Sequence, residues 1–105
     1  SKLGDGCVLI GEFRAGYAGM KEWVDKEDGK RKSRIDSHIL VEMVTQTGAQ
    51  SAKLYLNPPT TVTDPAEIKF PWKKGERYVF PIRGIKSEKG AISGSLDDRR
   101  EVLPI

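Results

Sequence analysis

Basic side chains cluster in one short segment. This segment, residues 29–34, begins at the glycine of an Asp28-Gly29 turn signal. The cations of this segment are Lys30, Arg31, Lys32 and Arg34. Alternate residues of a strand point to opposite faces, so we expect Arg31 on the face opposite the other three. Such a ridge can follow a phosphate backbone. Acidic residues in 25–28 directly precede it, so a solvated, solubilising hairpin is the alternative.

Aromatic residues interleaved with basic ones form a second signal. Proteins that bind single strands combine a positive groove with flat rings on which bases stack, at about 1–3 kcal/mol per base. Trp and Tyr are also common core residues, so some rings, Trp72 and Tyr78 among the candidates, are expected to pack inside. The rings with polar sequence neighbours are the preferred stacking platforms: Tyr17, Trp23 and Tyr55.

A charged hairpin near the end of the chain supplies the remaining candidates. Its turn is expected at 87–90, with Lys86 and Lys89 on either side of the tip. Hairpins that project from a barrel can wrap a ligand or a second subunit, and an exposed charged turn is the alternative. Arg99 completes the predicted set of nucleic-acid contacts.

Catalytic chemistry has little support in the sequence. His38 is the only histidine, it lies in an apolar stretch, and no cysteine or carboxylate cluster surrounds it at metal-ligand spacing. We therefore expect it in the core or in the wall of the fold. Cys7 has no neighbouring base and is interpreted as a buried thiol. Asp97 and Asp98 precede two arginines, which favours local ion pairs. The prediction is a protein without catalytic residues, metal or cofactor.

Strands must position these side chains. Apolar and β-branched stretches predict strands at 7–24, 35–45, 52–56, 77–85 and 91–103, the last interrupted at 97–98. Gly16 and Gly19 are expected to bend the first strand. The third strand ends where prolines follow Asn57, because proline cannot donate to a ladder. Asp64 and the three residues after it have the form of a capped helix start, and Ile68 and Phe70 are available to pack beneath it.

The whole chain, residues 1–105, is expected to form one domain, because its length is too short for two independent cores. Five strands with a short helix between the third and fourth predict an all-β fold, an OB-type β-barrel with projecting hairpins. An SH3-like barrel is the competitor, but its first two strands are usually shorter than those expected here.

Charge and cysteine content predict the kind of ligand and the cellular compartment. The chain carries 18 basic and 15 acidic residues, a mild excess that favours polyanions. A single cysteine and the lack of a signal-like apolar region predict that the protein is located in the reducing cytoplasm. No apolar run is long enough to span a bilayer, so a membrane is not expected as a partner.

Short motifs extend these expectations. They are Gly29-Lys30 at the start of the basic strand, Gly75-Glu76-Arg77-Tyr78-Val79, and Gly94-Ser95-Leu96-Asp97-Asp98-Arg99-Arg100-Glu101-Val102-Leu103-Pro104. From about Asp25 onward the chain resembles the filamentous-phage gene V proteins, which are compact OB proteins that bind single-stranded DNA. The resemblance implies a homodimer that coats strands cooperatively without sequence preference, with Lys30, Arg34 and Arg99 on phosphates. Glu101 in place of a basic residue, the lack of an aromatic near Ser33 and the added segment from Asp64 depart from the pattern.

Together these patterns predict a non-sequence-specific protein for single-stranded DNA that acts in replication or recombination. Neutralising about four phosphates would make the logarithm of the affinity fall with that of the salt concentration at a slope of about −3. Two alternatives stay open. One is a protein-interaction module whose exposed edge pairs with a partner strand, and the other is an OB domain that binds RNA.

Overall fold

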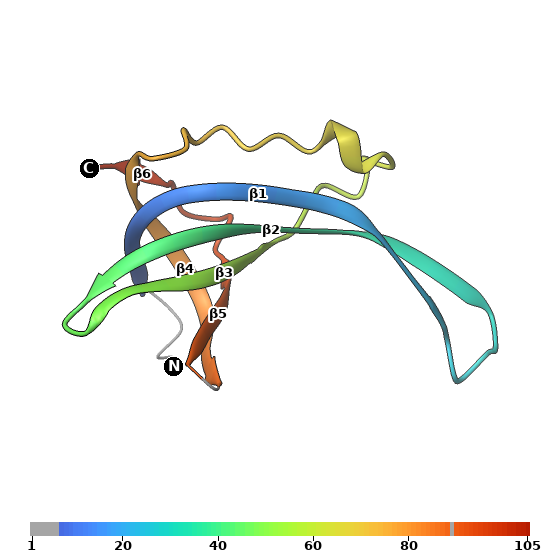
Figure 1. Ribbon diagram of the computed structural model, residues 1–105. Helices are drawn as coiled ribbons and strands as arrows, with labels where there is room; N and C mark the ends of the chain where they lie inside the picture. Colours follow the sequence, from blue (N-terminus) through green and yellow to red (C-terminus); the bar gives the residue numbers. More distant parts are fainter. Residues whose placement is uncertain (1–6, 89) are drawn as a thin grey trace.

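The computed structural model describes residues 7–88 and 90–105 (Figure 1). The expected all-β class is confirmed. The strands are β1 (Val8–Val24), β2 (Arg31–Thr45), β3 (Gly48–Leu56), β4 (Arg77–Glu88), β5 (Ala91–Leu96) and β6 (Leu103–Pro104). The described chain thus has one strand more than the five expected, because residues 97–102 form a turn and a loop that separate β5 from β6. A single 3-10 turn, η1 (Pro65–Glu67), lies between β3 and β4, where a short helix was expected. Asp64 caps it by accepting a hydrogen bond from the Ala66 amide at 3.0 Å.

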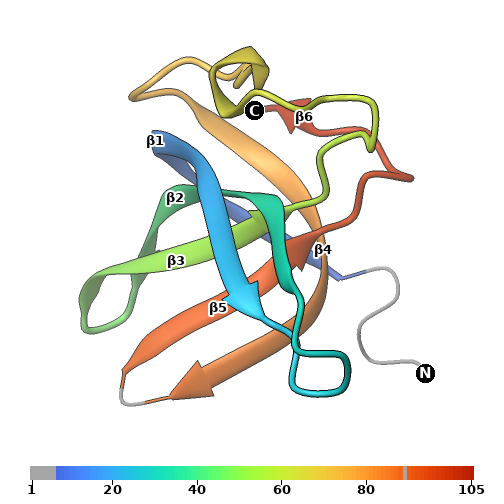
Figure 2. The same cartoon turned by 90° about the vertical axis from the view of Figure 1, so that its right-hand side faces the viewer.

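One sheet holds all the strands, in the order β1-β2-β3-β5-β4-β6. A further pairing between β1 and β4 closes the first five into a ring-like sheet (Figure 2). The β3–β5 pair is parallel and the other pairs are antiparallel. The first five residues of β1, Val8 to Glu12, pair with β4, and the strand from Glu12 onward pairs with β2, so this one long strand takes part in closing the ring.

The core lies inside the ring. Along β1 the buried residues Leu9 and Phe13 alternate with residues that face out, because successive side chains of a strand point to opposite faces. The other buried apolar residues are Ile39, Val41, Ala52, Leu54, Phe80, Ile82 and Leu96. Trp72 and Tyr78 pack against Phe80, with ring centroids 5.7 Å apart in both pairs. Two of the five candidate rings are therefore packing residues.

β1 and β2 continue beyond the ring as a two-stranded arm, defined here as residues 18–36 (Figure 1). β3 ends at Leu56, opposite Ser37, so it does not accompany the arm. The turn at the tip follows from its sequence. The Asp28 carboxylate accepts a hydrogen bond from the Lys30 amide at 2.9 Å, and Gly29 has the positive φ of 69° that the turn requires.

The two glycines expected to bend β1 have different surroundings. The register shift against β2 lies between Phe13 and Ala15, before both glycines. Gly16 lies under the Phe70 ring, where an added Cβ would come within 2.5 Å of the ring, whereas a Cβ on Gly19 would meet nothing within 4 Å. Gly16 is therefore needed for close packing. η1 buries none of its own residues, and Phe70 and Trp72 connect this segment to the core.

Asp97 organises the turn after β5. Its side chain is 3% exposed, and its carboxylate accepts hydrogen bonds from Arg99 Nε at 3.2 Å and from Arg100 Nε at 3.1 Å. Arg100 also donates to the carbonyl oxygen of Cys7 at 2.9 Å, which connects the turn to the start of the described chain. The expected local ion pairs are thus present.

These contacts predict an acid-sensitive contribution to stability. Hydrogen bonds from Arg99, with those of Arg100, lower the pKa of Asp97 from the ordinary 3.8 to about 2. Between these values the unfolded chain binds more protons than the folded one, so this contribution is complete above pH 4 and is lost as the pH falls toward 2. We expect Asp97→Asn to lower the urea midpoint at pH 7 and to flatten its fall between pH 4 and 2.

The exposed neighbour offers a control for this measurement. Asp98→Asn should leave the urea midpoint and its pH profile close to those of the unmodified protein. An Asp97→Asn profile as steep as that of the unmodified protein between pH 4 and 2 would contradict the assignment.

Candidate nucleic-acid interface

Three rings form a row across neighbouring strands on the outer face of the sheet. Tyr17 of β1 pairs with His38 of β2, which pairs with Tyr55 of β3. Directly opposite residues point to the same face, so the register alone brings them together. The Tyr17 and His38 rings stack at 5.1 Å, and Tyr55 meets His38 edge-on at 6.0 Å. Tyr17 is 50% exposed and Tyr55 41%, so this ring row offers aromatic surface to a ligand.

His38 was expected in the core or in the wall, and it lies in the wall on the outward side. Burial between its neighbours, and then the charge of Lys53, lower the pKa of His38 below the ordinary 6.5. The imidazole is therefore mostly neutral at pH 7 and contributes a ring rather than a cation to the row.

Trp23 continues the same face along the arm. It lies six residues beyond Tyr17, an even number, so both side chains point to the outer face about 20 Å apart. Its ring is 39% exposed, and the guanidinium carbon of Arg34 lies 5.8 Å from the ring centroid. Lys21 stands opposite Arg34 in the register. The outer face of the arm therefore combines one ring with adjacent cations.

Lys53 supplies a further cation beside the ring row. It lies two residues before Tyr55 on β3, and its ammonium group is 5.7 Å from the centroid of that ring. Among the described residues, no carboxylate forms an ion pair with Lys21, Arg34 or Lys53. These three positive charges are available to a polyanion, although Asp36 lies on the same face and works against them.

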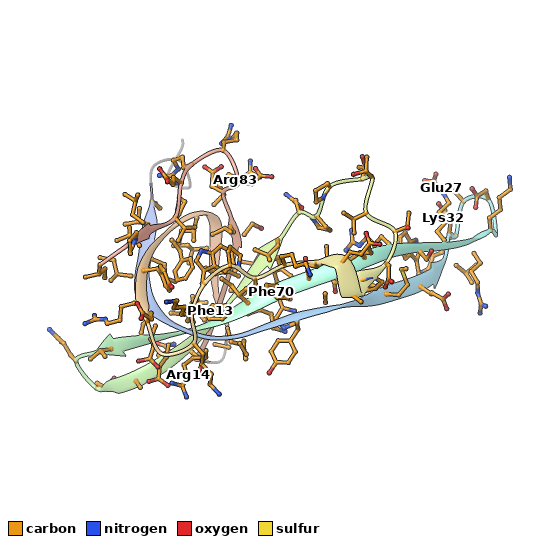
Figure 3. The ribbon with its side chains drawn as sticks, turned by 90° about the horizontal axis from the view of Figure 1, so that it is seen from above. Phe13, Arg14, Glu27, Lys32, Phe70 and Arg83 are labelled. Carbon is orange, nitrogen blue, oxygen red and sulfur yellow. The ribbon has the colours of Figure 1, made fainter. Side chains whose placement is uncertain are left out.

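The rest of the basic run is placed differently. Lys32 shares the outer face but forms ion pairs with Asp25 at 2.5 Å and Asp28 at 3.3 Å, at the arm tip (Figure 3). Its charge is already partly neutralised. Arg31 pairs with Val24 and points to the opposite face, as its position in the run predicts. Lys30 lies in the exposed turn.

The predicted contacts of the second hairpin are not joined to the ring row. Lys86 stands opposite Ser93, two strands further round the ring than β3, while Arg99 is held by Asp97 in the turn after β5. Lys89 lies outside the described residues. The site therefore gathers Tyr17, Trp23, Tyr55 and Arg34 of the predicted set, with Lys32 as a paired neighbour.

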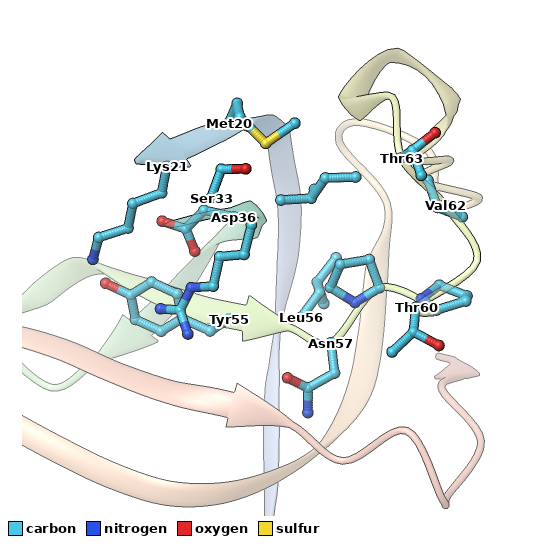
Figure 4. Close-up of a pocket in the computed structure, with 14 residues that line it drawn as sticks. Met20, Lys21, Ser33, Asp36, Tyr55, Leu56, Asn57, Thr60, Val62 and Thr63 are labelled. Carbon is cyan, nitrogen blue, oxygen red and sulfur yellow. The ribbon is translucent and has the colours of Figure 1, made fainter. Parts of the chain in front are cut away.

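A groove of about 770 Å³ adjoins this face, between the arm and residues 57–63 (Figure 4). Lys21, Arg34 and Tyr55 line one part of it, and Pro58 and Pro59 line the other. Asp36 lines the same part as the two cations, so this wall carries two positive charges, one negative charge and a ring, and the opposite wall is apolar at the two prolines. The size of the groove falls within the range of ligand sites.

Sequence reasoning missed three members of the site, namely Lys21, His38 and Lys53. Lys21 could have been found by extending the alternation from Tyr17 to Trp23, and Lys53 by extending it from Tyr55. His38 needed the strand register, since only pairing with both neighbours brings it between two tyrosines.

Comparisons with known proteins return no match. No protein-family model matches the chain, and neither a curated protein nor a solved structure matches it. Within residues 7–88 and 90–105, no helix is long and apolar enough to cross a membrane, and no three acidic, histidine or cysteine side chains are grouped to hold a metal ion. The interpretation of the outer face therefore depends on its own geometry.

Proposed function

We propose that this protein binds single-stranded DNA, without chemistry, on the outer face of β1, β2 and β3. The observation that carries the proposal is the ring row of Tyr17, His38 and Tyr55, continued by Trp23 and accompanied by cations that no carboxylate in the described chain pairs with. Bases stack on such rings while the cations bind phosphates, whatever the sequence of the strand.

We further propose that the ring-like sheet is an OB-type barrel. The closed order of β1, β2, β3, β5 and β4, with a short helix before β4, supports this proposal. OB proteins bind oligonucleotides on the face of their second and third strands and with the loop between the first two. Here the ring row crosses the same strands, and the arm carries that loop.

The rings favour unpaired strands over duplexes. A base in a duplex has both faces covered by its neighbours, so stacking on Tyr17 or Trp23 requires unstacked nucleotides. RNA is the alternative ligand, because a ring stacks on the base and does not distinguish ribose from deoxyribose. With the resemblance to gene V proteins, the proposal extends to a cytoplasmic homodimer that coats DNA during replication or recombination.

A salt titration tests the proposal. Lys21, Arg34 and Lys53 would neutralise about three phosphates, so the logarithm of the affinity should fall with that of the salt concentration at a slope of about −2. This slope is shallower than the four cations of the basic run predict. Arg31 faces away, Lys32 is paired and Lys30 lies in the turn at the arm tip. Only Arg34 of the run therefore counts, and Lys21 and Lys53 are added to it. Tryptophan fluorescence with an oligothymidine at several salt concentrations measures it.

Duplex DNA and an oligouridine of the same length serve as comparison ligands in that titration. The duplex should bind more weakly than the oligothymidine at every salt concentration, because its bases cannot stack on the rings. An oligothymidine titration that stays flat at low salt, or a duplex that binds as well, would contradict the proposal.

A further inference from the structure

β2 has an unpaired edge along the arm. β3 pairs with β2 from Ser37 onward and then turns away where Pro58 and Pro59 follow, so within the described chain no strand lies beside Arg31–Asp36 on the side away from β1. In an antiparallel strand, alternate residues direct both their N–H and C=O groups to the same side. Half of these residues therefore present free backbone groups. An edge of this kind is a template for another strand.

The groove occupies the place that a continued β3 would take. One of its sides is the edge of β2 at residues 33–36, and the other is formed by Pro58, Pro59 and Val62 (Figure 4). Figure 1 shows β3 leaving the sheet at this point while β1 and β2 continue. A volume of about 770 Å³ accepts a short extended chain.

The two faces of this vacant strand position differ in chemistry. On the outer face, a new strand would meet Lys21 and Arg34, which have no carboxylate partner in the described chain, and the carboxylate of Asp36. The two cations outnumber this one carboxylate, so an acidic side chain is favoured beside Lys21 and Arg34 and disfavoured beside Asp36. On the inner face it would meet Met20 and Ile35, which pair with each other in the register, together with Val62 across the groove. Because side chains alternate along a strand, each face of the incoming chain requires its own residue type.

We propose that this groove binds an extended peptide of alternating acidic and apolar residues, which adds a strand to β2. Backbone hydrogen bonds to the free edge supply affinity, and the two faces supply specificity. The acidic side chains pair with Lys21 and Arg34, and the apolar ones cover Met20 and Ile35. A second copy of the arm is less complementary than an acidic peptide, because its own edge would bring a second Arg34 to the cations of the groove.

This site goes beyond the proposed function, although the two surfaces share residues. Lys21, Arg34 and Tyr55 belong both to the groove and to the face that would bind a DNA strand. The peptide and the DNA strand should therefore compete. Competition of this kind would make DNA binding responsive to a protein partner with such a segment.

A labelled peptide of about eight residues, alternating Glu and Val, tests the docking mode in fluorescence anisotropy. The parent peptide should bind, and a Lys-Val peptide should not, because its charges meet Lys21 and Arg34. Two further peptides are methylated on the backbone nitrogens of all Glu or all Val residues. In a strand, the backbone N–H groups of either the Glu residues or the Val residues face β2, but not both. The peptide methylated on the set that faces away should bind like the parent, and the other should bind about tenfold more weakly or worse. Equal behaviour of the two methylated peptides would overturn strand addition.

Two variants separate this site from the DNA-binding face. Val62→Asp places a charge on the apolar side of the groove and should weaken the Glu-Val peptide about tenfold or more while oligothymidine binding is kept. Trp23→Ala, which does not line the groove, should weaken oligothymidine and leave the peptide unchanged. Retained binding of the other ligand shows in each case that the variant is folded.

The outcomes distinguish the two proposals. If Val62→Asp leaves the peptide affinity unchanged, the groove is not its site. If the peptide fails to bind, the peptide proposal is overturned. If Val62→Asp also weakens the binding of oligothymidine, the groove binds nucleic acid, and the proposal of DNA binding stands. If the peptide behaves as expected and oligothymidine does not bind at all, only the DNA proposal fails.

Discussion

The double variant Tyr17→Ala with Tyr55→Ala is expected to bind an oligothymidine at least about 30-fold more weakly than the unmodified protein. Each base that stacks on an aromatic side chain contributes about 1–3 kcal/mol, so two such rings together contribute about 2–6 kcal/mol, and the lower end of this range corresponds to roughly 30-fold. Both rings are 41% exposed or more, so their removal leaves the core intact. The fluorescence of Trp23 and Trp72 remains available for the measurement.

The matched control keeps the rings and removes only the hydroxyl groups. Tyr17→Phe with Tyr55→Phe should bind nearly as well as the unmodified protein, because stacking uses the face of the ring. An alanine double variant with unchanged affinity, or a phenylalanine double variant as weak as the alanine one, would show that the ring row does not bind bases.

Gly16→Ala is expected to destabilise the fold by about 1–3 kcal/mol, the usual cost of overpacking. The new methyl group would lie within 2.5 Å of the Phe70 ring, so either this ring or β1 must move. Phe70 is packed against the core, so its displacement also loosens the segment before β4. The midpoint of urea unfolding at neutral pH measures the loss.

Gly19→Ala is the matched control in the same strand. A Cβ there meets nothing within 4 Å, and its stability should stay within about 0.5 kcal/mol of that of the unmodified protein. Equal effects of the two substitutions would mean that the cost arises from losing glycine in a strand, and not from contact with Phe70.

Local patterns predicted several features of the site. Tyr17, Trp23 and Tyr55 were preferred as stacking platforms, and these rings lie exposed while Trp72 and Tyr78 pack against Phe80. Polar sequence neighbours alone do not explain this outcome, because Tyr55 lies between Leu54 and Leu56 whereas Trp72 adjoins Lys73. The face of the sheet to which each strand residue points decides its exposure.

The charges were harder to predict than the rings. The sequence treats Lys32 and Arg34 alike, yet the turn brings two carboxylates to Lys32 while Arg34 lies over Trp23. Arg99 was expected on phosphates, but its Nε donates to the buried carboxylate of Asp97 and forms an ion pair with it. Such partners depend on distances across a turn or between strands, which residue types alone do not contain.

By itself, the sequence determined the places of β1 to β5, the Asp28-Gly29 turn and the capped helix start at Asp64, because each depends on residues close to one another in the chain. It did not show that β5 ends at Leu96 and that only Leu103 and Pro104 return to the sheet as β6. The tertiary structure decided that His38 completes the ring row, that Phe70 covers Gly16, and that β2 has an unpaired edge beside a groove. These features join residues far apart in the chain. They follow from strand register, in which a shift of one residue would turn every side chain to the other face.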